Sequence, residues 1–387
     1  MKKMVYAGTN ATSFRQAECD LAAEAELSIS QQRIMRATKR IGQERVEQRA
    51  AAVEQWRALP LPERQRSPHD HVPSLVCVQV DGGRLQIRPD EPEVSRAGKK
   101  SFWRESKAAV LLRMHSEEHQ ADPCPTLPES FANIARMAQL SREIQGSSAA
   151  AVAAPGAREE HEEARPTRPQ VLTRNVVAMR ACREDFGAHV AASAWESGFS
   201  AAPRKAFVAD GLACNWTIWR DYFSHYTPVL DFVHAICHVF NAAAAGRALD
   251  EVAALYRRWA QWTWSGQVDL VIDELQARQQ ELGLPQAGDA QTHPRQVIAD
   301  TLGYLRNQRE RMQYAEYRRR GLPITSAYIE STIKQINRRV KGSEKFWSAG
   351  GAEALLQLSA DYLSDRAPLD KFWQDRPTHR PGYRCYR

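Results

Sequence analysis

Three acidic side chains stand where carboxylates could together hold metal ions. Asp81 follows the apolar segment SLVCVQV, Asp210 follows RKAFVA, and Glu330 lies near the start of a helix expected after Pro323. The carboxyl ends of strands in an α/β sheet border one crevice, and a nearby helix can add a third ligand. Carboxylate oxygens suit Mg²⁺ or Mn²⁺, and two such ions about 4 Å apart can activate water and stabilise the leaving oxygen of a phosphodiester. The sequence therefore predicts a two-metal site formed by Asp81, Asp210 and Glu330.

Each of these acids also has a structural explanation when it is taken alone. Asp-Gly after a strand, as at Asp81 and Asp210, is typical of a turn. An acid in the first turn of a helix, such as Glu330, compensates the helix dipole. The prediction of a metal site thus depends on the joint placement of the three carboxylates by the fold.

The segment LDFVHAICH adds a fourth acidic feature. It places Asp231 three residues before His234, at an expected strand-to-helix corner, where the pair could orient DNA or water at the edge of the site. His234 and His238 are four residues apart and would share a helix face, which is a spacing found among zinc ligands. The glutamate of the H-E-x-x-H zinc motif is absent, because Ala235 follows His234. A zinc enzyme formed around these two histidines is therefore the weakest of three functional hypotheses.

The elements that must position these residues begin with a helical N-terminal region. Residues 11–57 favour two helices, the first capped by Ser13, with a short break at 27–30. The second helix carries Arg33 and Arg36 near its start, so the pair could be a helix-turn-helix that reads DNA. A helical hairpin that only packs against the rest of the protein is an equally good interpretation.

The strands are expected after this helical region. Segments 74–83 and 83–90 are separated by Asp-Gly-Gly and predict a hairpin. The order of elements favours an α/β fold, namely a mixed five-stranded sheet with helices on both faces and a helical block before the last helix. The further elements are a third strand at 103–116, a long helix at 171–198, strands at 204–211 and from 227, and a last helix at 324–348.

These elements divide the chain into four regions. Residues 1–68 form the helical N-terminal region, and residues 69–246 form the first part of an α/β core. Residues 247–322 form an all-helical insertion, and residues 323–387 return to the core and end in a basic tail.

The excess positive charge of the chain is local. The 387 residues hold 53 basic and 46 acidic side chains, a net charge of +7, while residues 301–345 alone hold 11 basic and 4 acidic ones, and 11 − 4 = +7. A polyanion is therefore expected along this window, although a solvated helix face is the common explanation for such a segment. Four of the basic residues, which follow Glu330 along one helix, are proposed to contact phosphates: Lys334, Arg338, Arg339 and Lys341.

Cysteine usage and hydropathy exclude other classes of protein. The seven cysteines are scattered without a C-x-x-C pair, which is typical of a reducing compartment rather than of a disulfide framework or a cysteine-rich zinc site. No stretch reaches the roughly 18 apolar residues of a membrane span. We therefore expect a cytoplasmic protein with no membrane partner.

Several segments together resemble bacterial Kra-type insertion-sequence transposases, which are distant relatives of the Mutator-like DDE transposases. The resemblance extends from about residue 74 to the C-terminus and, more weakly, over residues 13–49. No single motif is decisive, but their order and spacing are specific. The motifs are VDGGRLQIR, SFWRESKAAVLL, FVADGLACNW, VLDFVHAICHVF, LGYLRNQRERMQYAEYRRRGLPITSAYIESTIKQINRRVKGSEKFW and GAEALLQL.

The resemblance implies an RNase H-like core with a helical insertion and a catalytic triad of Asp81, Asp210 and Glu330. It also implies an Asp-x-x-His motif at Asp231 and His234. The expected activity is cutting and joining of DNA strands at element ends with two Mg²⁺ or Mn²⁺ ions. The expected partners are terminal inverted repeats and target DNA, bound by a homodimer or a larger synaptic complex at the bacterial nucleoid.

The chain departs from the family before the glutamate. The family usually has glycine-rich sequence there, where this chain has Thr325-Ser326-Ala327-Tyr328. The alternative function is accordingly a catalytically degraded transposase that acts only as a DNA-binding protein.

Overall fold

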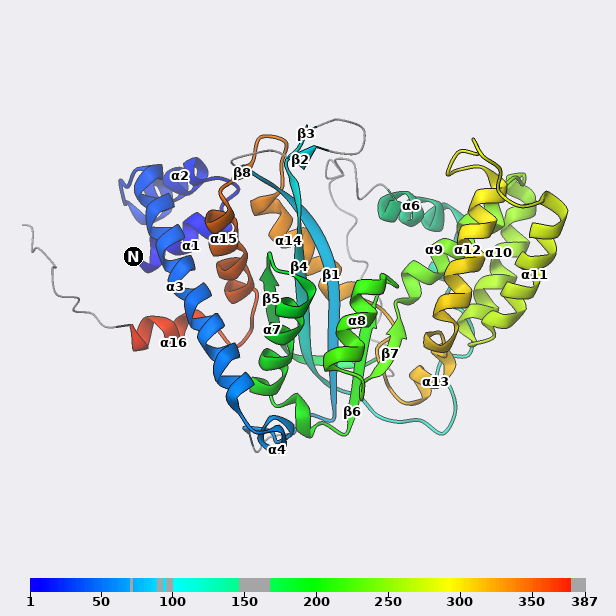
Figure 1. Cartoon of the computed structure of the whole chain (residues 1–387), viewed down its shortest axis with the longest axis horizontal. Helices are drawn as coiled ribbons and strands as arrows, with labels where there is room; N and C mark the ends of the chain where they lie inside the picture. Colours follow the sequence, from blue (N-terminus) through cyan, green and yellow to red (C-terminus); the bar gives the residue numbers. More distant parts are fainter. Residues whose placement is uncertain (70–71, 89–92, 95–99, 146–167, 377–387) are drawn as a thin grey trace, which may run out of the picture.

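The protein has a mixed six-stranded sheet at its centre, flanked by helices (Figure 1). The computed structural model describes residues 1–69, 72–88, 93–94, 100–145 and 168–376. The main path of the sheet runs in the order β5-β4-β1-β6-β7, and β8 also pairs with β1. The strands are β1 (Leu75–Ile87), β4 (Trp103–His115), β5 (Gln170–Met179), β6 (Arg204–Ala209), β7 (Thr227–Leu230) and β8 (Phe346–Trp347), with β2 (Glu93–Val94) and β3 (Lys100–Ser101) as a separate pair.

Strand directions in this sheet are mixed. β4 is antiparallel to both β1 and β5, whereas β6 and β8 are parallel to β1 and β7 is parallel to β6. The strands predicted at 103–116, 204–211 and from 227 are confirmed, as is the parallel pairing of the last two. Residues 75–80 are buried without interruption, because β1 is covered on both faces.

The hairpin predicted at 74–90 is wrong. β1 is one continuous strand through Asp81, Gly82 and Gly83, which stand opposite Ala108, Lys107 and Ser106 of β4. Neither glycine has a positive φ. The antiparallel partner β4 is as long as β1, and its ladder of hydrogen bonds keeps the Asp-Gly-Gly segment extended rather than turned.

The long helix predicted at 171–198 is also wrong in its first half. Residues 170–179 form β5, which pairs with β4 from Lys107↔Met179 to His115↔Gln170. Only residues 183–196 are helical. The β-branched run VLTRNVV has strand propensity, and the open edge of β4 supplies the partner that decides its conformation. The five predicted strands thus become six, with β1 replacing the hairpin and with β5 and β8 added.

Four helices precede the sheet, and the two predicted ones are confirmed. The N-cap at Ser13 is confirmed as well, since the Gln16 amide donates to its Oγ at 3.0 Å. The long α3 packs against α1, α2, α7 and α15. These helices are α1 (Lys2–Asn10), α2 (Phe14–Ala25), α3 (Gln31–Ala58) and α4 (Leu61–Gln65).

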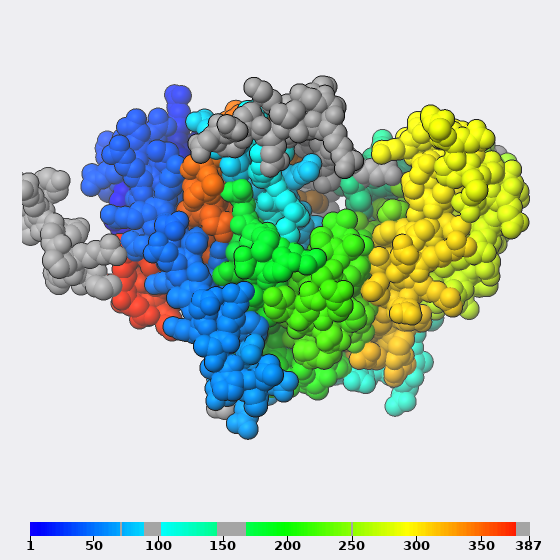
Figure 2. All heavy atoms as spheres, in the orientation of Figure 1, coloured from blue at the N-terminus to red at the C-terminus, as the bar shows by residue number. Residues whose placement is uncertain are grey.

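The remaining helices lie on both sides of the sheet and in a separate lobe. Figure 1 shows α7 and α8 in front of the sheet and α14 behind it. Figure 2 shows the N-terminal helices and the helices around residues 250–320 at opposite ends of the molecule, and Figure 1 shows the sheet between them. The helices are α5 (Glu129–Ala132), α6 (Ile134–Gln145), α7 (Arg183–Glu196), α8 (Ala213–Tyr222), α9 (Phe232–Ala244), α10 (Leu249–Trp264), α11 (Val268–Leu282), α12 (Pro294–Gln308), α13 (Tyr314–Arg319), α14 (Ala327–Val340), α15 (Ala349–Tyr362) and α16 (Pro368–Asp375), with 3-10 turns η2 (Phe199–Ala201) and η3 (Arg309–Arg311).

Among the described residues, no helix is both long and apolar enough to cross a membrane.

Candidate functional site

Acidic residues lie at the same level of three neighbouring parallel strands, within β1 and directly after β6 and β7. Gln79 of β1 pairs with Val208 of β6, and Ala209 of β6 pairs with Leu230 of β7. Two residues beyond the first pair are Asp81 and Asp210, and the residue after Leu230 is Asp231. Since adjacent strands lie about 4.8 Å apart, the sheet presents these three acids as a row along one edge.

Asp210 begins a tight turn that is held from two sides. Its Oδ1 accepts hydrogen bonds from the Leu212 amide at 3.0 Å and from Asn215 Nδ2 at 2.9 Å. From α12, the Tyr304 hydroxyl donates to the Asp210 carbonyl at 2.9 Å, and Gln308 Nε2 donates to the next carbonyl at 3.0 Å. The helical lobe thereby fixes the position of the Asp210 carboxylate.

We expect Gly211→Ala to destabilise the protein and to displace Asp210. Gly211 has φ +101°, and a Cβ there would lie 2.8 Å from the Tyr304 ring. The backbone strain and this overlap should together lower the free energy of unfolding by about 2 kcal/mol or more. Denaturant unfolding measures the change, and Gly350→Ala is the control because a Cβ there meets nothing within 4 Å. Equal stabilities of the two variants would contradict the prediction.

Hydrogen bonds of the Asp231 side chain link the start of α9 to the start of α14. It is fully buried, its Oδ2 accepts from the His234 amide at 3.0 Å and from His234 Nδ1 at 2.5 Å, and its Oδ1 accepts from the Ser326 amide at 2.9 Å. The Ser326 hydroxyl in turn donates to Glu330 Oε1 at 3.0 Å. Both carboxylate oxygens of Asp231 are therefore occupied by structural bonds.

Glu330 lies close to Asp231 and His234. Ligand-type atoms of Asp231, His234 and Glu330 lie within 4.8 Å of one another, the one such group of three among the described residues. Asp81 and Asp210 are not part of that tight group. They are nevertheless close enough to interact electrostatically, because the charges of Asp210, His234 and Glu330 all shift the pKa of Asp81.

The acids share a poorly solvated space with little compensating charge. Burial, followed by the negative charge of Asp210, raises the pKa of Asp81 to about 7. Burial and the charge of Asp231 also raise the pKa of Glu330. Burial by itself would lower the pKa of His234, but its hydrogen bond to Asp231 and the surrounding carboxylates outweigh burial and raise the pKa to about 9. The site thus contains carboxylates that repel one another and a histidine that is positively charged at neutral pH.

The donor set fits a hard divalent cation. Asp81 Oδ1 accepts from the Gly82 amide at 2.6 Å, while Asp210 Oδ1 and Glu330 Oε1 have the partners given above. Within the described part of the chain, the second oxygen of each of these three carboxylates has no hydrogen-bond or ion-pair partner. Three such oxygens in a space where carboxylates repel one another are suitable ligands for Mg²⁺ or Mn²⁺.

His234 and His238 make different contacts. His238 lies outside the group of possible ligands, its ring stacks on Tyr304 with centroids 3.9 Å apart, and burial lowers its pKa to about 4. His234 directs Nδ1 to Asp231. The two side chains thus have different partners, and of the two only His234 belongs to the group of possible ligands among the described residues.

Ser326 is a residue of the site whose role the sequence motifs do not show. The signal was present, since a serine at a helix N-cap four residues before Glu330 lies one turn below it. That position belongs to the segment in which the chain departs from glycine-rich sequence. Asp231, which the sequence places at the edge of the site, lies beside His234 and Glu330 and is fully buried.

Three of the four basic residues predicted after Glu330 are accessible. Lys334 and Arg338 are exposed on α14, and Lys341 is half-buried at its end. Arg339 is only 4% exposed, so its assignment to DNA binding is wrong. Its Nε and Nη2 donate to the Gly8 carbonyl at 3.1 and 3.0 Å, and its guanidinium lies over the rings of Phe14 and Trp347. Arg339 faces away from the other three because α14 turns it toward α1.

The neighbouring arginines should therefore respond differently to alanine substitution. We expect Arg339→Ala to lower the free energy of unfolding by about 3 kcal/mol, because it removes two buried hydrogen bonds and two cation–π contacts. Arg338→Ala should change it by less than about 0.5 kcal/mol, because its side chain is exposed. Denaturant unfolding of both variants tests this, and comparable losses would contradict the assignment.

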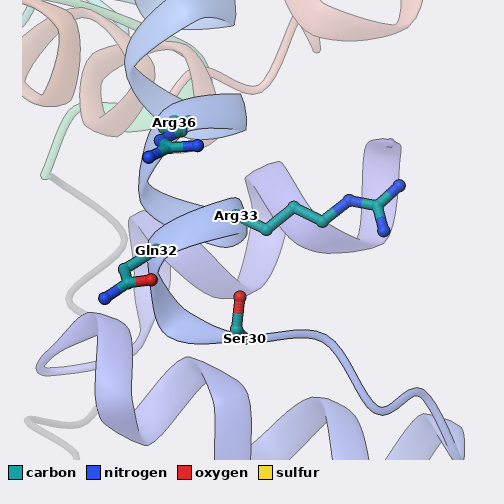
Figure 3. A pocket seen from close by; sticks show the side chains of 4 residues that line it. All are labelled: Ser30, Gln32, Arg33 and Arg36. Carbon is teal, nitrogen blue, oxygen red and sulfur yellow. The ribbon is translucent and has the colours of Figure 1, made fainter.

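Arg33 and Arg36 lie on the exposed side of the N-terminal helices. With Ser30 and Gln32 they line a shallow hollow at the start of α3, and Arg33 extends outward from the helix (Figure 3). Both side chains are exposed, so they are accessible to a phosphate backbone, as the helix-turn-helix hypothesis requires.

No known protein-family model matches the chain. A search of curated proteins also finds no significant match.

Proposed function

We propose that this protein is a DDE transposase of a bacterial insertion sequence, with an RNase H-like catalytic core. The supporting observation is the row of acids formed by Asp81 within β1 and by Asp210 and Asp231 directly after β6 and β7, with Glu330 of α14 close by. A metal-binding cluster at this edge of a sheet is what the sequence resemblance to Kra-type transposases leads us to expect. In this proposal residues 69–246 and 323–387 form the core, residues 247–322 the helical insertion and residues 1–68 a DNA-binding region.

The proposed roles follow from the donor atoms. Asp81, Asp210 and Glu330 would hold two Mg²⁺ or Mn²⁺ ions, which when bound supply an activated water and stabilise the leaving oxygen. Asp231 would keep His234 protonated at the edge of the site. A protonated His234 can donate a hydrogen bond from Nε2 to a phosphate oxygen, and it balances part of the negative charge of the carboxylates.

Basic side chains would hold the DNA beside the acids. Lys334, Arg338 and Lys341 follow Glu330 along α14 and are proposed to contact backbone phosphates near the metal ions. Arg33 and Arg36 are proposed to contact DNA at the N-terminal helices. Binding should weaken steeply with salt, because each neutralised phosphate releases counterions.

The proposed partners are the terminal inverted repeats of the element and target DNA. The resemblance to Kra-type transposases also supports the proposal of a homodimer or a larger synaptic complex. The proposed location is the bacterial cytoplasm at the nucleoid.

The test uses DNA that contains the sequences flanking the reading frame of this protein. The purified chain should bind this DNA in a gel shift and, with Mg²⁺ or Mn²⁺, release 3′-hydroxyl ends at fixed positions. Chelation of the metal should stop cleavage and leave binding in place. Binding without metal-dependent cleavage would favour the alternative, a catalytically degraded transposase that only binds DNA. Neither binding nor cleavage would contradict both proposals.

A further inference from the structure

Gln79 is a buried polar residue whose side chain forms hydrogen bonds with the backbone around the start of α14. It is 0% exposed and lies on β1 two residues before Asp81, so the two side chains project from the same face of the strand. Its Nε2 donates to the Thr325 carbonyl at 3.0 Å, and its Oε1 accepts from the Ile329 amide at 3.1 Å. The Gln79 side chain is thus hydrogen-bonded to the backbone before and after the first residue of α14.

This contact replaces the usual cap of the helix. Ser326 is the N-cap residue of α14, but its side chain makes no capping bond to the backbone. The amide three residues after an N-cap normally donates to the cap side chain. Here that amide belongs to Ile329, and it donates to Gln79 Oε1 at 3.1 Å and to the Ser326 carbonyl at 3.0 Å. The Ser326 hydroxyl is consequently available to donate to Glu330 Oε1.

We infer that Gln79 is a positioning residue that caps α14 from the neighbouring strand and thereby sets Glu330 against Asp81. The inference rests on the proposed metal site, since that site needs both carboxylates at once. Asp231 secures the same turn from β7 through the Ser326 amide. Two buried side chains from two strands therefore determine where the helix starts, and the freed serine hydroxyl orients the Glu330 carboxylate.

The same strand supplies a matched control. Gln86 is 7% exposed, and its Nε2 donates to the carbonyls of Gly342 at 2.6 Å and Ser343 at 3.2 Å, just after α14 ends. Gln79→Met and Gln86→Met each remove a buried glutamine that ties β1 to α14. Only the first removal lies beside Glu330, so the pair separates loss of positioning from general destabilisation.

The experiment measures Mn²⁺ affinity by titration calorimetry and amide hydrogen exchange of residues 325–332. Gln79→Met should bind Mn²⁺ about 10- to 100-fold more weakly than the wild type, the range found for residues that orient metal ligands. It should also speed exchange in 325–332. Gln86→Met should leave both measurements within about twofold of the wild type. The milder variant Ser326→Ala should weaken Mn²⁺ binding without faster exchange.

Several outcomes would overturn this inference. Wild-type affinity in Gln79→Met, or equal losses in Gln79→Met and Gln86→Met, would show that Gln79 has no special effect on the site. Absence of Mn²⁺ binding by the wild type would overturn both the metal site and the role of Gln79 in it. Loss of Mn²⁺ binding in Gln79→Met together with a wild type that cleaves no DNA would support the inference and contradict the transposase proposal.

Discussion

Asp81→Asn is expected to lower metal-dependent cleavage of element ends by more than about 100-fold while DNA binding persists. Loss of a residue that only orients a ligand costs 10- to 100-fold, so loss of a direct ligand should cost more. The amide keeps the shape of the side chain and can still accept from the Gly82 amide. It cannot supply the negatively charged oxygen that the proposed ions need.

The measurement compares cleavage rates of labelled end DNA with Mg²⁺ at a protein concentration that saturates binding. Asp221→Asn is the matched control, because Asp221 is an exposed aspartate on α8 outside the group of acids. Gel shifts of all three proteins show whether DNA is still bound. Equal cleavage by wild type and Asp81→Asn would refute the assignment of Asp81 as a metal ligand.

The same Asp81→Asn substitution should stabilise the metal-free protein at high pH. Burial and the charge of Asp210 raise the pKa of Asp81 from 3.8 to about 7. Below pH 3.8 the residue is protonated in both the folded and unfolded states. Between these two pKa values only the unfolded state ionises, so the folded protein binds more protons and its stability falls as the pH rises. Above pH 7 the penalty is complete and corresponds to at most about 4 kcal/mol.

Denaturant unfolding from pH 4 to 8 in a chelating buffer tests this expectation. Asp81→Asn should unfold at a higher midpoint than the wild type at pH 8, and the difference should vanish near pH 4. Adding Mn²⁺ should raise the wild-type midpoint and leave that of the variant almost unchanged. A variant that is less stable than wild type at pH 8 would show that the ionised Asp81 carboxylate does not destabilise the folded protein.

A second window of pH dependence should remain in Asp81→Asn. The pKa of His234 is raised from 6.5 to about 9, chiefly by Asp231 acting against burial. A raised histidine pKa stabilises the folded state at low pH, and that stabilisation is lost between pH 6.5 and 9. The two residues therefore act in adjacent windows, which allows their effects to be separated in one titration.

Much of the site could be predicted from local sequence. Short apolar segments that end in Asp, such as those before Asp210 and Asp231, show both the strand and its end. The helix that carries Glu330 is equally clear, because α14 has a strongly amphipathic pattern and follows a proline. Each of these elements has a periodicity set by its own residues, so no distant partner is needed to recognise it.

The long-range pairings could not be predicted in this way. Asp-Gly-Gly at residues 81–83 has the composition of a turn, and only the matching length of β4 makes it part of a strand. Residues 170–179 became β5 because β4 offered an open edge. Strand conformation depends on hydrogen bonds to a partner that is distant in sequence, which local pattern does not contain.

The sequence by itself determined the acids of the candidate site, their order and most of the elements that hold them. Tertiary structure decided what surrounds each side chain. The position of Arg339 in the sequence predicts a DNA contact, but its guanidinium bonds the Gly8 carbonyl of α1 in the interior. The hydrogen bonds of Asp231 to His234 and Ser326 also depend on the packing of α9 and α14. Gln79 carried no signal at all, because the groups that it bonds come from a helix about 250 residues later in the chain. Burial and hydrogen-bond partners are properties of the packed chain, so they appear only once distant segments meet.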